Sequence, residues 1–164
     1  MAAPGFYFYV KGNSLLGSLF ILGALFDSVD GVVARKTDKT SKFGGVLDAT
    51  LDRIFEGVLL LCIGIGNLVS WNLVMLLYIF SISVSYVKSK AETVLQETSV
   101  GTNQLSVGIA QRGERVVIIF LSSILNYFFT PESNSLFNIA LLILTLLAAF
   151  TLLWRLKVVY NLLR

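Results

Sequence analysis

The sequence predicts an all-α integral membrane protein, a helical bundle with about five transmembrane helices. Of its 164 residues, 55% are hydrophobic, and the mean hydropathy of +0.79 is far above that of an ordinary soluble domain. Five apolar segments are each long enough to cross a bilayer, which takes roughly 20 helical residues. They are residues 5–29, 45–67, 70–91, 107–129 and 136–157.

Polar connections separate these segments, and residues 1–164 are expected to form a single domain without an internal repeat. The first segment begins with the aromatic run Phe6–Tyr9, which is typical of the belt at a membrane interface. Residues 36–43 and 92–104 are polar and predict the two longer connections. Pro131 predicts a short turn before the last segment, because proline cannot continue a helix.

The basic residues are distributed as the positive-inside rule describes. With five helices, Lys11 alone falls on one side of the membrane, and the connections 67–72 and 130–138 carry no Lys or Arg. The other side should therefore be cytoplasmic. The basic residues on that side are Arg35, Lys36, Lys39, Lys42, Arg53, Lys88, Lys90, Arg112, Arg115, Arg155, Lys157 and Arg164.

Composition excludes several kinds of site. The chain has no histidine, which rules out histidine acid–base chemistry and histidine metal ligation. Its one cysteine, Cys62, cannot form an intrachain disulfide and is expected to be a small core residue. The net charge of +3 is small, and no nucleic-acid partner is expected.

Four aspartates at helical spacings predict a metal site at the cytoplasmic side. Asp27 and Asp30 are three residues apart, and Asp48 and Asp52 are four apart, so each pair shares a helix face. Four converging carboxylates suit hard divalent cations, Mg²⁺ or Mn²⁺. Two such ions could bridge a pyrophosphate and stabilise charge on its leaving oxygen. Clustered carboxylates beside a membrane core are usually functional.

Small residues beside the aspartates predict room for a phosphorylated ligand. Gly31 and Ala34 continue the face of Asp30, and Gly44 lies one turn before Asp48. Close packing between helices would also favour such small residues. Arg35 could pair with a phosphate in forked geometry.

The run from Asp27 to Asp52 has the pattern D-x2-D-G-x2-A-R-x8-G-x3-D-x3-D, which resembles the signature of the CDP-alcohol phosphotransferase family. The resemblance implies that Asp27, Asp30, Asp48 and Asp52 bind metal, and that Asp52 is the general base. It also implies that Asp30, Gly31, Ala34, Arg35 and Gly44 bind the CDP group. Family members usually have six transmembrane helices, so this chain would lack the first. A homodimer is suggested by the resemblance alone.

Two further segments, Ser85-Tyr-Val-Lys-Ser-Lys-Ala-Glu92 and Val107-Gly-Ile-Ala-Gln-Arg-Gly-Glu-Arg115, resemble the inositol phosphate synthase branch of that family. There, a lysine and two arginines bind the phosphate of the acceptor. The matching residues are Lys88, Arg115 and Arg155, and Arg112 is a further candidate. Ser89 and Gln111 depart from the pattern of the branch. Glu56, one turn after Asp52, could orient Arg53 or Arg115, or only solvate its helix.

These features predict a membrane enzyme of phospholipid biosynthesis that transfers a phosphatidyl-type group from a CDP-activated lipid to inositol 1-phosphate and releases CMP. The lipid could be CDP-diacylglycerol or CDP-archaeol, and the site would face the cytoplasm. Glycerol 3-phosphate is the alternative acceptor, since it is also a phosphorylated polyol. A membrane cation transporter is an alternative of another class, because clustered carboxylates also line ion paths. An inactive relative is a third.

Overall fold

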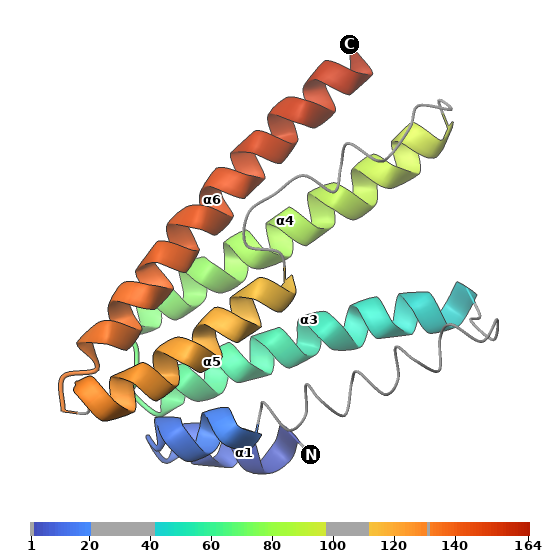
Figure 1. Cartoon of the computed structure of the whole chain (residues 1–164). Coiled ribbons are helices and arrows are strands. Elements are labelled where there is room, and N and C mark those ends of the chain that lie inside the picture. Colours follow the sequence, from blue (N-terminus) through green and yellow to red (C-terminus); the bar gives the residue numbers. More distant parts are fainter. Residues whose placement is uncertain (1, 21–41, 98–111, 131) are drawn as a thin grey trace.

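The computed structural model describes residues 2–20, 42–97, 112–130 and 132–164, and every regular element within them is a helix. The labelled helices are α1 (Ala2–Val10), α3 (Lys42–Ile65), α4 (Trp71–Glu97), α5 (Arg112–Phe129) and α6 (Ser135–Leu163) (Figure 1). Residues 14–20 are also helical. The predicted all-α fold is therefore confirmed.

The helices form a bundle with two different ends. Helix α6 packs along α4 and α5, while α3 packs against α1 and α4. The turns that follow α3 and α5 lie close together at one end, which we call the turn end (Figure 1). The beginnings of α3 and α5 and the last turns of α4 and α6 point away from it. We call that opposite end the charged end, because Asp48 and Arg115 lie in the first two turns of α3 and α5, and Lys88 and Arg155 lie in the second halves of α4 and α6.

The main apolar cluster of the interior contains side chains from every labelled helix. Its members include Tyr9 of α1, Leu60 of α3, Leu77 of α4, Ile119 of α5 and Phe137 of α6, each at most 1% exposed. Cys62 is buried in the same cluster, as expected of a small core residue. This main cluster lies mainly toward the turn end, while Ala91 of α4 packs against Val159 and Leu162 of α6 nearer the other end.

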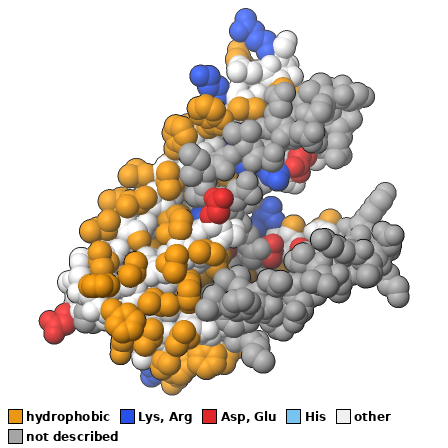
Figure 2. All heavy atoms as spheres, viewed as in Figure 1, with side chains coloured by type: hydrophobic (Ala, Val, Ile, Leu, Met, Phe, Trp, Pro, Cys, Tyr) orange, Lys and Arg blue, Asp and Glu red, His pale blue; other side chains and the backbone are white. Residues whose placement is uncertain are grey.

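The outer faces of the helices are strongly apolar. Large hydrophobic side chains of α3, α4, α5 and α6 are exposed, including Leu61, Ile79, Leu125 and Leu146. Figure 2 shows such side chains covering most of the visible surface around the turn end. So wide an apolar surface is typical of contact with lipid. Two described spans are long and apolar enough to cross a membrane, Trp71–Val94 and Ser135–Leu163.

The first predicted segment, residues 5–29, is wrong as a single helix. Helix α1 ends at Val10, and Gly12 adopts a φ of 74°, a left-handed conformation that favours glycine. The backbone N–H of Leu16 then donates to Oδ1 of Asn13, 3.1 Å away, as at the start of a new helix. The chain therefore reverses at residues 11–13, and α1 lies against α3. Residues 21–29 lie outside the described part.

Within the described residues, the other predicted segments agree with the helices to within a few residues, with two corrections. Residues 107–111 of the fourth segment, and residues 36–41 and 98–104 of the predicted connections, lie outside the described part. Residues 92–97 belong to α4 rather than to a connection, because Ala91-Glu-Thr-Val-Leu-Gln-Glu97 is rich in helix-forming residues. Helix α6 continues six residues beyond the predicted end at residue 157. The turn predicted near Pro131 is confirmed, since α5 ends at Phe129 and α6 begins at Ser135.

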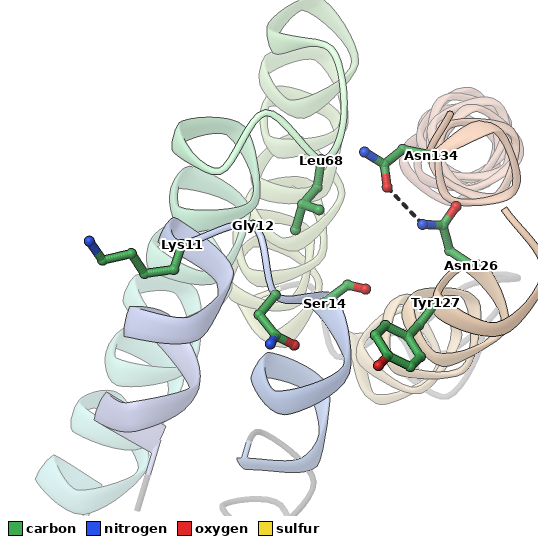
Figure 3. A pocket seen from close by; sticks show the side chains of 8 residues that line it. Lys11, Gly12, Ser14, Leu68, Asn126, Tyr127 and Asn134 are labelled. Atoms are coloured by element: carbon green, nitrogen blue, oxygen red, sulfur yellow. Dashed lines mark hydrogen bonds between the residues drawn. The ribbon is translucent and has the colours of Figure 1, made fainter. Parts of the chain in front are cut away.

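Asparagines hold the turn end together. The Asn126 amide nitrogen donates to Oδ1 of Asn134 at 2.7 Å, and the Asn138 amide binds the Leu68 carbonyl at 3.4 Å. Between the connections lies a cavity of about 310 Å³. Figure 3 shows the Asn126–Asn134 bond beside the cavity, while the Lys11 side chain extends away from the other labelled residues. These amides serve packing between the turns.

We expect Gly66→Ala to destabilise the protein, because the end of α1 passes close to this glycine, which directly follows α3. An added Cβ would lie 2.0 Å from the carbonyl oxygen of Tyr9, a backbone atom that cannot rotate away. The expected loss in unfolding free energy is about 1–3 kcal/mol. Gly45→Ala is the control, since its Cβ would meet nothing within 4 Å. Thermal unfolding in detergent micelles checks both variants, and equal melting temperatures would contradict the close approach of α1 and α3.

Candidate active site

Five of the eight fixed positions of the predicted signature lie outside the described residues. These positions are Asp27, Asp30, Gly31, Ala34 and Arg35. The other three positions are on α3, where Gly44 is exposed near the start and Asp48 and Asp52 follow at intervals of four residues. The structure therefore describes only the part of the predicted metal and CDP sites that lies on α3.

Helix α3 presents one acidic face. Asp48, Asp52 and Glu56 follow at intervals of four, so their side chains lie in one row along the helix. Asp48 and Asp52 are partly exposed, whereas Glu56 is only 4% exposed. The row thus runs from the accessible start of the helix into the interior of the bundle.

The donor set of this face fits a divalent cation. Asp48 and Asp52 offer carboxylate oxygens from consecutive turns, and Mg²⁺ and Mn²⁺ prefer such ligands. Among the described residues, no three acidic or cysteine side chains come together. The other two predicted ligands, Asp27 and Asp30, belong to the part that is not described.

At the buried end of the row, Glu56 binds Arg115 of α5. Nε of Arg115 donates to Oε1 of Glu56 at 2.8 Å, and Nη2 donates to Oε2 at 3.1 Å. Ser81 of α4 completes the group, accepting from Arg115 Nη2 and donating to Glu56 Oε1, both at 2.8 Å. Of the roles predicted for Glu56, the structure supports the orientation of Arg115. Arg53 instead donates to the Ala49 carbonyl of its own helix.

The predicted basic residues converge on one face of α4. Arg115 reaches Ser81, and Nη1 of Arg155 donates to the Val84 carbonyl at 2.8 Å. Ser81, Val84 and Lys88 are spaced by three and four residues, so they share a face of α4. Three cations from α4, α5 and α6 therefore lie along one strip.

The strip becomes more accessible toward the charged end. Arg115 and Arg155 are buried, at 2% and 5% exposure. The side chain of Lys88 is 44% exposed, and its amine lies 3.8 Å from Glu92 one turn later. Figure 2 shows acidic and basic side chains close together, beside the large apolar surface. Arg112 begins α5, but its side chain lies outside the description.

Sequence reasoning did not identify Ser81 or the Val84 carbonyl as parts of this group. Ser81 lies seven residues before Lys88, which places it on the same face two turns earlier. A buried hydroxyl in an apolar helix needs a partner, and this spacing was the available signal.

Comparison with known proteins supports a common family. The sequence model of the family described as CDP-alcohol phosphatidyltransferase matches residues 1–160. The chain is 43% identical over 119 residues to the archaetidylinositol phosphate synthase of Pyrococcus horikoshii, covering 73% of this chain and 60% of that protein. It is 32% identical over 154 residues to the archaetidylinositol phosphate synthase of Methanothermobacter thermautotrophicus, covering 93% and 74%.

Solved structures share the fold. The phosphatidylinositol phosphate synthase of Mycobacterium tuberculosis with CDP-DAG bound superposes with a TM-score of 0.76 at 24% identity, covering 97% of this chain and 80% of that one. The same protein in complex with manganese and citrate gives a TM-score of 0.77, with coverages of 97% and 76%. With the family model matching nearly the whole length, the chain belongs to the CDP-alcohol phosphatidyltransferase family.

Proposed function

We propose that this protein transfers a phosphatidyl-type group from a CDP-activated lipid to inositol 1-phosphate and releases CMP. The acidic face of α3 would serve the CDP group, and the basic strip on α4 would serve the phosphate of the acceptor. Two archaetidylinositol phosphate synthases among the relatives support this choice of acceptor. The site would face the cytoplasm, because the basic residues gather at the charged end.

One observation carries the proposal: Arg115 of α5 and Arg155 of α6 bind the face of α4 that also bears Lys88. A phosphate dianion in a partly buried site needs several cations, and arginines give directional contacts while a lysine gives a mobile charge. The α3 row that bears Asp52 joins this group through Glu56. The two substrates would therefore meet between α3 and α4.

In the proposed reaction, Asp52 is the general base. Its carboxylate would accept the proton of the acceptor hydroxyl as that oxygen attacks the β-phosphorus of the CDP-lipid. A new oxygen–phosphorus bond forms, the bond to the bridging oxygen breaks, and CMP leaves with that oxygen. Arg115, Arg155 and Lys88 would hold the acceptor by its own phosphate, and so place the hydroxyl in line.

The carboxylates Asp48 and Asp52, together with Asp27 and Asp30, would hold two divalent ions, Mg²⁺ or Mn²⁺. When bound, a divalent cation neutralises charge on the pyrophosphate and on the departing CMP. A relative in this fold was solved in complex with manganese, which supports a metal site.

The test is CMP release by purified protein in liposomes that contain CDP-diacylglycerol or CDP-archaeol. Inositol 1-phosphate, glycerol 3-phosphate, free inositol or no acceptor is added, with Mg²⁺, Mn²⁺ or EDTA. Of the acceptors, we expect only inositol 1-phosphate to support CMP release, and we expect EDTA to abolish that release. Release with glycerol 3-phosphate instead would keep the reaction and overturn the acceptor. Cation flux across the liposome without CMP release would favour a transporter.

A further inference from the structure

We propose that Glu56 and Ser81 are positioning residues that fix the guanidinium of Arg115 for the phosphate of the acceptor. This inference rests on the proposed function, because Arg115 has this role only if the basic strip binds that phosphate. Neither Glu56 nor Ser81 would touch the substrate. Both would act through the orientation of Arg115.

Hydrogen bonds hold the guanidinium of Arg115 along the edge formed by Nε and Nη2. Glu56 accepts from Nε and Nη2 of Arg115 in side-on, two-bond fashion, and Ser81 accepts from Nη2 as well. Three hydrogen bonds from two helices set both the position and the plane of a planar group. Glu56 is itself held, since Ser81 donates to its Oε1. All three residues are at most 4% exposed, so water does not compete.

If Glu56 acted only through its charge, its loss would strengthen binding of the acceptor, which is the opposite of what positioning predicts. Its carboxylate cancels the charge of Arg115, so an anionic acceptor would be attracted more strongly without it. Positioning predicts that losing Glu56 or Ser81 weakens acceptor binding, because the guanidinium then leaves the direction that the phosphate requires. The sign of the change therefore separates the two roles.

Ser81→Ala is the sharper variant, because it keeps the ion pair, and Ser123→Ala is its matched control. Ser123 is also a buried helical serine, which accepts from the Tyr9 hydroxyl at 3.2 Å and donates to the Ser14 carbonyl at 3.0 Å. It lies on α5 away from the charged end. Each substitution removes one hydroxyl that accepts one bond and donates another.

We expect Ser81→Ala to raise KM for inositol 1-phosphate about tenfold, with kcat and the KM for CDP-lipid changed by less than about twofold. Calorimetric titration of inositol 1-phosphate should show the same loss of affinity without turnover. Ser123→Ala should change neither quantity. Glu56→Gln, where it folds, should weaken binding in the same direction.

Equal KM values in the two serine variants, or tighter binding in Glu56→Gln, would overturn the positioning role. Wild-type protein that binds no inositol 1-phosphate would also overturn it. If the wild type binds inositol 1-phosphate but releases no CMP, the proposed reaction fails. The titration of Ser81→Ala against Ser123→Ala would then still decide the role of Ser81.

Discussion

Asp52→Asn should lower the rate of CMP release about 10²- to 10⁴-fold, the usual contribution of a positioned general base. Asparagine has nearly the same size, so the partly exposed face of α3 should keep its packing. Its amide cannot accept the proton of the acceptor hydroxyl. Initial rates in liposomes, with inositol 1-phosphate and CDP-lipid both saturating, measure the loss directly.

The control for Asp52→Asn is Glu132→Gln, which removes an exposed carboxylate in the turn before α6. Its rate should stay within about twofold of the wild type, because an exposed charge at the turn end is screened from the charged end. Raising the Mn²⁺ concentration should not restore Asp52→Asn, since a missing proton acceptor is not replaced by metal. Full recovery at high Mn²⁺ would make Asp52 a metal ligand only. A rate within about threefold of the wild type would contradict both roles.

Hydropathy predicted where the helices lie because length and apolarity are local properties of the chain. The predicted segment 45–67 agrees closely with α3, and the predicted start at residue 136 agrees with the start of α6. The same measure missed the reversal at residues 11–13. A window of about 20 residues averages a single Lys-Gly-Asn turn with the apolar residues on either side. The turn chemistry of Gly12 and Asn13 was the better guide there.

Side-chain partners were harder to predict because they depend on how each helix is rotated in the bundle. Spacing along α3 placed Asp48, Asp52 and Glu56 on one face, which the helix confirms. It could not say which of two arginines Glu56 binds, since Arg115 is 59 residues away. Tyr9 is a similar case. The interfacial belt predicted for it is wrong, because Tyr9 is 1% exposed and its hydroxyl binds Ser123.

Glu56→Gln should destabilise the folded protein by about 3–5 kcal/mol, the usual result of removing one partner from a buried ion pair. The carboxylate accepts two bonds from Arg115, and both groups are nearly inaccessible to water. A glutamine offers one oxygen and one NH₂ group, so one bond is lost and two donors face each other. The charge of Arg115 then stays in the interior without the carboxylate of Glu56.

The exposed pair of Lys88 and Glu92 provides the matched control. It has the same kind of charges, but its side chains are 44% and 40% exposed and its closest atoms are 3.8 Å apart. Water solvates either partner when the other is removed, so Glu92→Gln should change the unfolding free energy by less than about 1 kcal/mol. Thermal and denaturant unfolding in detergent micelles, followed by tryptophan fluorescence, compares the two variants.

The double variant Glu56→Met with Arg115→Met tests why Glu56→Gln is destabilised. It distinguishes the loss of attraction between the two side chains from the cost of burying Arg115 without Glu56. Methionines fill similar volume and bring no charge into the interior, so stability should return to within about 1–2 kcal/mol of the wild type. CMP release should stay low, because Arg115 would no longer hold the acceptor. Recovery of stability without activity would show that the pair is kept for the site rather than for folding. Equal destabilisation by Glu56→Gln and Glu92→Gln would instead show that the interior near Glu56 is open to water.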